Sequence, residues 1–238
     1  MKFDKIKVVA ISDLHGYLPK DLPECDVVCI AGDILPLDIQ SDQLRSISWF
    51  CLDFKPWAES LKCEKVIFIA GNHDFLFEQI GPQSSRSATE VMKKLLGNHK
   101  KDSKLVYLCN SSYEFKGRRF YGFPWCPNLK RWAFYQDHEQ LEKQCEIIPK
   151  KCDVLITHCP PKLGLVGTVL ENNWNYMCDF GCQELTEALI MRDIKWCIGG
   201  HIHSGLHKPE FICNTNIVNV SLKNENYKVD YEPFVFEI

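Results

Sequence analysis

Gly199-Gly200-His201-Ile202-His203, near the C-terminal end of the 238-residue chain, is the stretch that decides the fold. Two histidines separated by one residue on an extended segment project to opposite sides. A single metal ion would not naturally take both rings, but each ring can reach a different ion where a strand ends and a loop begins. That geometry requires the remaining ligands to come from other parts of the chain.

Four other polar clusters follow apolar runs in the same way: Asp13-x-His15, Gly32-Asp33, Gly71-Asn72-His73-Asp74 and Thr157-His158. The runs before them predict buried strands over residues 7–12, 26–31, 65–70 and 153–157, and a fifth over 195–198 leads into Gly199. Ligands collect at the carboxyl ends of strands in open α/β sheets. We therefore expect the five clusters to meet at one edge of the fold.

The segments between these runs alternate between helical patterns and short strands. A helix is predicted from Ser41 or Asp42 to about Leu61, ended or kinked at Pro56, with others over about 89–96, 137–146 and 181–192. Short strands are predicted over 105–108, 112–115, 118–123, 210–213, 217–222 and 234–236, and residues 162–180 read as a long loop without periodicity.

This pattern favours an α/β fold, a two-sheet β-sandwich flanked by helices, with a metal site at the strand C-terminal ends. The length suits a single domain over residues 1–238.

Taken one at a time, the polar clusters have simpler explanations. Asp-x-His and Gly-Asp are common in surface turns, and Asn-His-Asp after a strand could cap the next helix. Five such clusters, each after a predicted strand, are hard to explain as coincidence. Carboxylates, imidazoles and one amide suit manganese, iron, zinc or another first-row ion. Two such ions about 3.5–4 Å apart can bind both the attacking and the leaving oxygen when one group displaces another at phosphorus.

The motifs resemble the calcineurin-like metallophosphoesterase superfamily over about residues 7–205. The resemblance rests on Asp13-Leu14-His15-Gly16, Gly32-Asp33, Gly71-Asn72-His73-Asp74, His158 and Gly200-His201-Ile202-His203. It implies seven ligands for two divalent metal ions: Asp13, His15 and His203 for one ion, Asn72, His158 and His201 for the second, and Asp33 as the bridge between them. It also implies that His73 faces the substrate phosphate and stabilises or protonates the leaving oxygen.

A narrower resemblance is to the metallophosphodiesterase-domain branch, which includes class III cyclic-nucleotide phosphodiesterases. It rests on Tyr121-Gly122-Phe123-Pro124-Trp125, Trp132-Ala133-Phe134, His158-Cys159-Pro160-Pro161 and Gly181-Cys182-Gln183-Glu184-Leu185. It implies hydrolysis of a small phosphodiester, such as a cyclic nucleotide, by in-line attack of a hydroxide that bridges two metal ions. The alternatives are a phosphomonoesterase, for nucleotides or phosphoproteins, and a catalytically silent scaffold.

One position departs from the family pattern. Many members carry an acid three residues after the bridging aspartate, where it pairs with the catalytic histidine, but Pro36 stands there in this chain. Asp38 could replace that acid. Without a carboxylate partner, His73 would be less basic and less well oriented, which weakens the case for monoesters with poor leaving groups.

Composition limits the classes of partner. The 28 basic and 31 acidic residues give a net charge of −3, which argues against capture of a long nucleic acid. No apolar run is long enough to span a membrane, and charges interrupt any signal peptide. The 13 cysteines lack C-x-x-C spacing and suggest free thiols in a reducing compartment. We therefore expect a cytoplasmic enzyme; the sequence leaves its oligomeric state open.

Substrate selection is expected to come from loops. Five aromatic side chains could stack on a nucleobase or could instead cover a sheet edge: Trp125, Trp132, Phe134, Trp174 and Tyr176. The helix start at Gly181 could bind a phosphate or carboxylate, or be an ordinary cap. Three histidines have no partner that the sequence identifies and are expected on the surface: His99, His138 and His207.

Overall fold

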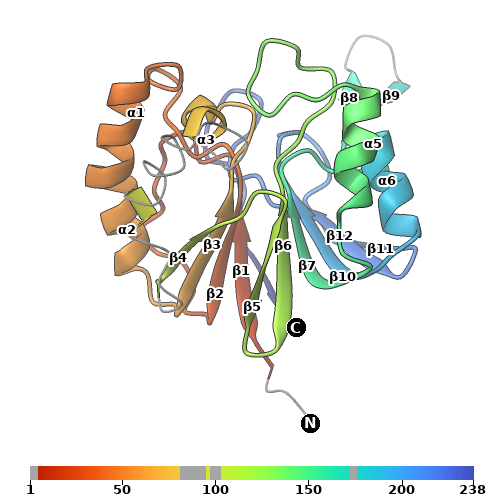
Figure 1. Cartoon of the computed structure of the whole chain (residues 1–238), viewed down its shortest axis with the longest axis horizontal. Helices are drawn as coiled ribbons and strands as arrows, with labels where there is room; N and C mark the ends of the chain where they lie inside the picture. The colour runs from red at the N-terminus through yellow and green to blue at the C-terminus, as the bar shows by residue number, and fades with distance from the viewer. Residues whose placement is uncertain (1–4, 81–94, 97–102, 172–175) are drawn as a thin grey trace.

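Two β-sheets pack face to face in the computed structural model, which describes residues 5–80, 95–96, 103–171 and 176–238 (Figure 1). The first sheet contains β1 (Lys7–Ile11), β2 (Val27–Ala31), β3 (Lys65–Ile69), β4 (Leu105–Tyr107) and β13 (Phe234–Glu237), in the order β13-β1-β2-β3-β4. The second contains β5 (Ser111–Phe115), β6 (Arg118–Phe123), β7 (Lys151–Thr157), β10 (Asp193–Gly199), β11 (Glu210–Ile212) and β12 (Thr215–Asn219), in the order β11-β12-β10-β7-β6-β5.

The strands inside each sheet run parallel, and the antiparallel strands lie at the edges. β1 to β4 are parallel and β13 is antiparallel to β1. β6, β7, β10 and β12 are parallel, with β5 and β11 antiparallel at the two edges. The loops that follow the parallel strands gather at one end of the sandwich, the upper end in Figure 1.

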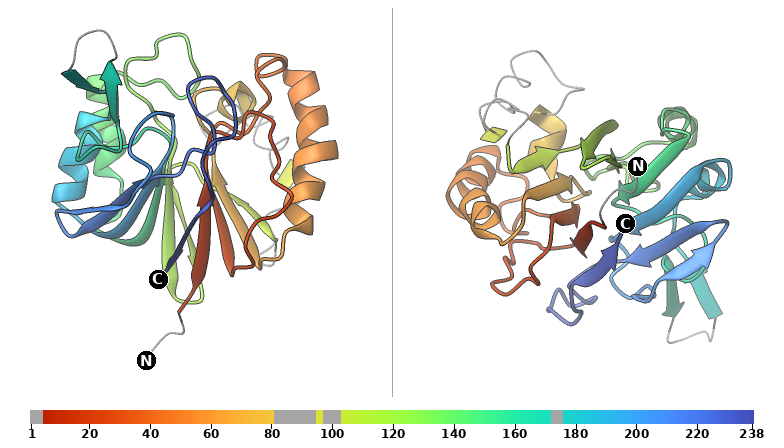
Figure 2. Two further views of the ribbon diagram at one scale, coloured as in Figure 1. Left: turned by 180° about the vertical axis from the view of Figure 1, so that it is seen from behind. Right: turned by 90° about the horizontal axis from the view of Figure 1, so that it is seen from below.

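The apolar side chains divide into two cores because successive residues of a strand face opposite sides. In β1, Val8 and Ala10 face the core between the sheets, whereas Val9 and Ile11 face the helices. α1 (Gln43–Trp49), α2 (Lys55–Ser60) and α3 (Phe75–Ile80) lie on the side of the first sheet, and α5 (His138–Glu146) and α6 (Gln183–Ile190) cover the second (Figures 1 and 2). The predicted sandwich with outer helices is confirmed.

The helix predicted from about residue 42 to 61 passes through Pro56 without ending there. Asp42 caps α1, a π-helical segment η1 (Phe50–Phe54) follows, and Pro56 lies in the first turn of α2. Proline has no N–H, and its ring crowds the carbonyl four residues earlier. A wider turn immediately before it relieves both problems, so the helix continues.

The prediction of an unstructured loop over residues 162–180 is wrong in part. β8 (Thr168–Glu171) and β9 (Tyr176–Asp179) form an antiparallel two-stranded sheet in this segment. A two-stranded ribbon has no large buried face, so its sequence need not alternate between apolar and polar residues. Most of the helix predicted over residues 89–96 lies outside the described residues, although Leu95 and Leu96 are helical and buried.

The prediction of one domain over residues 1–238 stays a prediction, as does a cytoplasmic location. In the part of the chain that the structure describes, no helix has both the length and the apolar character that crossing a bilayer requires.

Phe120 of β6 tests the core between the sheets, because its side chain is fully buried there. We expect Phe120→Ala to lower the free energy of unfolding by about 3–5 kcal/mol, since it removes a large apolar side chain and leaves a cavity. Phe211→Ala, at a side chain that is 68% exposed, is the matched control. Urea denaturation measures both changes, and equal losses would contradict the assignment of this core.

Candidate metal centre

The loops that carry the five polar clusters are joined to one another by hydrogen bonds from backbone N–H groups to carbonyls and carboxylates. The Asp13 N–H donates to the Gly32 carbonyl at 3.1 Å, and the Gly200 N–H donates to the His158 carbonyl at 2.9 Å. Between the two sheets, the His201 N–H donates to the Asp13 carboxylate at 3.0 Å. The clusters therefore meet at one end of the sandwich, as the sequence predicts.

Four of the predicted site residues have left-handed backbone conformations: Asp13 (φ 55°), His15 (φ 41°), Asp33 (φ 54°) and His201 (φ 67°). Such conformations are uncommon and costly for residues other than glycine, and they concentrate at functional sites. Gly200 is required for a different reason. A Cβ atom there would overlap the side chains of Ser12 and Asp13, so only glycine lets the two sheets approach so closely.

Asp33 lies in the middle of the cluster and is 1% exposed. Its Oδ2 atom is 3.4 Å from Nε2 of His158, 3.7 Å from Nε2 of His15 and 3.9 Å from Nε2 of His73. Its Oδ1 atom accepts the His73 N–H at 2.8 Å. An oxygen that faces several nitrogens at distances longer than most hydrogen bonds leaves room for cations between them.

Three groups of side chains among the described residues bring their ligand atoms within 4.8 Å of one another: Asp13, His15 and His203; His15, Asp33 and His73; and Asp13, Asp33 and His158. Both ring nitrogens of His15 are buried without a hydrogen-bond partner in the described chain. Buried polar atoms without partners are costly, and a cation would provide a partner for one of these two nitrogens. The donor set therefore fits a divalent first-row metal ion.

His158 links Asp33 to Asn72. The Asn72 Oδ1 atom is 2.9 Å from Nε2 of His158. The His201 ring lies beside His158 with 5.1 Å between ring centroids. His201 belongs to none of the three close groups of acidic, histidine and cysteine side chains found in the described chain.

Backbone carbonyls fix the orientation of two of the imidazoles. Nδ1 of His158 lies 2.8 Å from the Ala31 carbonyl, and Nδ1 of His203 lies 3.0 Å from the Asn224 carbonyl. Because a carbonyl can only accept, Nδ1 carries the proton in both rings, and the Nε2 atoms point into the centre. This is the arrangement that protein metal sites use to orient histidine ligands.

The charges in the cluster follow from burial and mutual attraction. Burial alone would raise the pKa of Asp33, but the imidazoles of His158, His73 and His15 together outweigh burial and hold this pKa below its ordinary range. Burial alone would lower the pKa of His158, yet the Asp33 carboxylate raises it to about 10. Burial lowers the pKa of His15 and of His201 to about 4. At neutral pH Asp33 is ionised and the His15 and His201 rings are neutral, the states that metal ligation requires, whereas His158 would give up a proton on binding a cation.

Gln40, and not Asp38, is the partner of His73. The Gln40 Oε1 atom lies 2.5 Å from Nδ1 of His73, so Nδ1–H donates to the amide oxygen. The Asp38 carboxylate pairs instead with Arg45 on the surface, 3.0 Å away. The sequence does not predict this contact. Gln40 lies four residues after Pro36, in a segment without helical or strand periodicity, so nothing indicates where its side chain points.

The aromatic side chains divide between the core and the site. Trp125 and Phe134 are buried in the core. The Trp132 ring lies against His73, with 4.4 Å between ring centroids. Trp174 and the side chain of Tyr176 lie outside the described residues. Of the five, Trp132 is therefore the ring that the described structure places beside the centre.

The prediction of surface positions holds for His138, whose side chain is 69% exposed, and is wrong for His207. Nδ1 of His138 lies 2.6 Å from the Glu184 carboxylate, which raises the His138 pKa. His207 is half-buried, contacts the His203 carbonyl through Nε2 at 2.9 Å, and stacks on Tyr231. These contacts are long-range and have no local sequence pattern. His99 lies outside the described residues.

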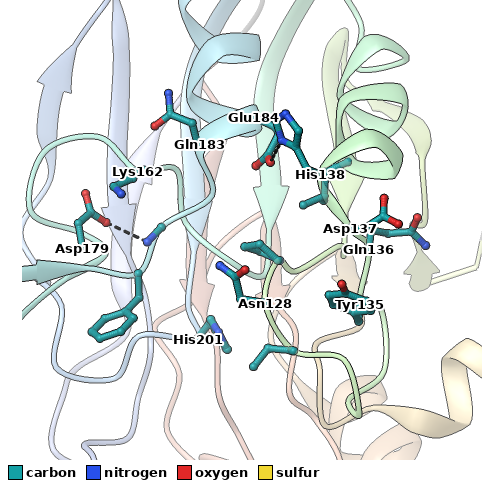
Figure 3. Close-up of a pocket in the computed structure, with 15 residues that line it drawn as sticks. Asn128, Tyr135, Gln136, Asp137, His138, Lys162, Asp179, Gln183, Glu184 and His201 are labelled. Atoms are coloured by element: carbon teal, nitrogen blue, oxygen red, sulfur yellow. Dashed lines mark hydrogen bonds and ion pairs between the residues drawn. The ribbon is translucent and has the colours of Figure 1, made fainter.

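Two hollows open beside the cluster. The first, of about 330 Å³, lies between the loop before α5 and the start of α6, with His201 at its edge (Figure 3). At the start of α6, Cys182 provides no side-chain cap, and the Gly181 N–H donates to Asp179 Oδ1 at 2.8 Å. The second hollow, of about 380 Å³, lies directly over the cluster and is lined by Asp33 and His73 among others. Both volumes fall at the small end of the range for ligand pockets.

Residues 6–205 match the family model of the calcineurin-like phosphoesterase. The chain belongs to this family. It is 31% identical over 244 residues to metallophosphoesterase domain-containing protein 1 of Homo sapiens, a match that covers 98% of this chain and 71% of that protein. It is also 30% identical over 245 residues to a UPF0046 protein of Caenorhabditis elegans, covering 99% of this chain and 82% of the relative.

The crystal structure of phosphopantetheinyl hydrolase from Mycobacterium tuberculosis has the same fold, with a TM-score of 0.56 and 14% identity over 93% of this chain and 90% of that one. The family and the fold predicted from the sequence are therefore confirmed, and members of this family are metallophosphoesterases.

Asp74 ties two of the site loops together. Its buried carboxylate accepts the N–H groups of Ile34 at 3.0 Å, Leu35 at 2.9 Å and Gly71 at 2.8 Å. The loop after β2 is thereby fixed to the loop after β3. The sequence places Asp74 in the motif but does not show this role.

We expect Asp74→Ala to lower the free energy of unfolding by about 1–3 kcal/mol, because it leaves buried N–H groups without acceptors. Hydrogen exchange should also speed up at the Ile34 and Gly71 amides. Asp42→Ala, which removes the N-cap of α1, is the control: it should cost about 1 kcal/mol. If both variants change the exchange of these two amides equally, the clamp assigned to Asp74 is wrong.

Proposed function

We propose that the chain is a dinuclear metal-dependent phosphodiesterase that hydrolyses a small phosphodiester, with cyclic nucleotides as the first class to test. The observation that carries the proposal is the single buried cluster around Asp33 Oδ2, which three imidazole nitrogens face at 3.4–3.9 Å. The family and the fold support a phosphoester substrate.

In this proposal two sets of side chains share Asp33: Asp13, His15 and His203 hold one divalent cation, and Asn72, His158 and His201 hold the other. Manganese, iron and zinc all suit these donors. Bound there, the two cations would supply Lewis acidity toward the phosphoryl oxygens and toward an attacking water. The orphaned nitrogens of His15 and the carbonyl-oriented rings of His158 and His203 support this assignment.

His73 acts on the leaving oxygen in the proposed reaction. Its Nδ1–H is held by Gln40, and its ring packs against Trp132, so its Nε2 atom points toward the cluster. With Nδ1 protonated, the neutral ring offers Nε2 only as an acceptor. Donation to the leaving oxygen therefore requires the protonated ring, and a neutral amide stabilises that state less than a carboxylate would.

A comparison of diester and monoester substrates tests the function. With manganese added, we expect bis(p-nitrophenyl) phosphate to exceed p-nitrophenyl phosphate in kcat/KM by at least about tenfold, or about 1.4 kcal/mol of transition-state stabilisation. Chelation should abolish turnover, and Asp33→Asn should lose metal and activity together. Selective turnover of the monoester would instead indicate a phosphatase, and metal binding without turnover would indicate a scaffold.

The natural substrate class needs a second screen. We would assay 2′,3′- and 3′,5′-cyclic nucleotides with the same metal-loaded protein. Turnover of either class supports the proposal, whereas turnover of aryl diesters alone would exclude cyclic nucleotides as the physiological class.

Replacement of Gln40 tests the orientation of His73. We expect Gln40→Ala to lower kcat by about 10–100-fold, part of the 10²–10⁴-fold that a positioned proton donor contributes. The loss should be larger for diphenyl phosphate, whose phenolate is a poorer leaving group, than for bis(p-nitrophenyl) phosphate. Asp38→Asn, on the neighbouring surface, should leave kcat unchanged. Equal behaviour of the two variants would show that Gln40 does not position the ring.

A further inference from the structure

The tail turn, residues 224–228, lies beyond the segment that the family model matches. Asn224 organises it: its Oδ1 atom accepts the N–H groups of Asn226 at 3.0 Å and Lys228 at 3.2 Å, and its carbonyl accepts the Tyr227 N–H at 2.8 Å. Tyr227 has a left-handed backbone conformation, φ 56°. A non-glycine residue held in this conformation indicates that its surroundings fix its position.

The tail turn is attached directly to the metal centre. The Asn224 carbonyl accepts Nδ1–H of His203 at 3.0 Å. The Tyr227 ring stands edge-on to three rings of the centre, with centroid distances of 5.0 Å to His15, 5.3 Å to His203 and 6.5 Å to His73. Seen from behind, the tail loops lie at the same end of the sandwich as the site loops (Figure 2).

The hollow over the centre is therefore walled in part by the tail turn. Glu225 and Tyr227 line it together with Asp33, His73 and His203. None of the described residues that line this hollow is a lysine or an arginine. Lys223, next to the turn, is buried and directs Nζ to the His15 carbonyl at 3.3 Å, so its charge does not face the hollow.

Charge distinguishes the two substrate types that could enter. A phosphomonoester has a second pKa of about 6 and carries close to two negative charges at neutral pH, whereas a diester carries one. The Glu225 carboxylate repels each of these charges, and no lysine or arginine in the described lining offsets it. Because Glu225 is exposed, the difference amounts to about threefold to tenfold in favour of the diester and falls with ionic strength.

Tyr227 supplies the opposite contribution, a hydrogen-bond donor. A tyrosine phenol has an ordinary pKa of about 10, so it carries its proton at neutral pH. A neutral donor at the wall of the hollow can bind a phosphoryl oxygen without adding charge.

We propose that the tail turn selects the substrate of this centre by charge, with Glu225 disfavouring dianionic monoesters and Tyr227 binding the phosphoryl group of monoanionic diesters. This inference rests on the proposed function, since it names the substrate class of the same site.

Paired charge-neutralising variants test the role of Glu225. We expect Glu225→Gln to raise kcat/KM for p-nitrophenyl phosphate about threefold to tenfold relative to bis(p-nitrophenyl) phosphate, and the gain to shrink at high salt. Glu232→Gln, the same change at an exposed residue outside the hollow, should leave the ratio as in the wild type. An unchanged ratio in Glu225→Gln overturns the proposal.

Calorimetric binding to the manganese-loaded protein tests both residues without turnover. At a pH where inorganic phosphate is dianionic, Glu225→Gln should tighten phosphate binding severalfold and leave dimethyl phosphate binding unchanged. Tyr227→Phe should weaken binding of both anions about fivefold or more, the loss of one hydrogen bond to a charged group, with manganese affinity unchanged.

Wild-type binding of phosphate in Tyr227→Phe would overturn the role of Tyr227. These titrations also separate the two proposals. If the wild-type protein hydrolyses neither ester, the proposed function fails, whereas the binding differences still decide whether the tail turn selects by charge.

Discussion

The burial of two carboxylates at the ends of β1 and β2 is the constraint on which the rest of this structure depends. Asp13 and Asp33 are 0% and 1% exposed. An ionised carboxylate taken out of water costs several kcal/mol unless other groups compensate for its lost hydration. Part of the compensation comes from the first sheet, since the His73 N–H donates to Asp33. The rest comes from the second sheet: His158 faces Asp33, and His203 and the His201 N–H contact Asp13. The contacts that assemble the centre therefore also hold the two sheets together.

The parallel arrangement of the strands explains why these partners are available. In each sheet the crossovers return the chain to the opposite end, so every parallel strand ends at the same edge and delivers a loop there. The loops then need tight turns, which the left-handed conformations at Asp13, Asp33 and His201 supply. The backbone strain at these residues is offset by the contacts that their side chains make across the interface. Asp74 adds a further restraint, because it binds N–H groups on two neighbouring loops.

The sequence allowed the strand-end residues to be predicted because buried parallel strands are continuous apolar runs and the polar residues after them stand out. It could not reveal Gln40, which reaches His73 from a segment without periodicity. It could not reveal that Asn224 orients His203 either, because the contact is made by a backbone carbonyl, which every residue type has. β8 and β9 were not predicted for a related reason: a two-stranded ribbon has no core that would require apolar and polar residues to alternate along it. Local sequence patterns show which residues are buried, whereas contacts between polar groups far apart in the sequence can be identified only once the fold is known.

The partners of the histidines separate two kinds of ring in this centre. His158 and His203 are held by backbone carbonyls, which fix one tautomer and cannot change charge. His73 is held by the neutral amide of Gln40, where the family resemblance led us to expect an acid, so this partner adds no negative charge. A carboxylate on Glu225, at the wall of the same hollow, adds negative charge where a substrate would enter. The neutral partner of His73 and the carboxylate of Glu225 both favour a substrate that carries little negative charge and needs little help from a strong proton donor. A phosphodiester fits these two conditions better than a monoester.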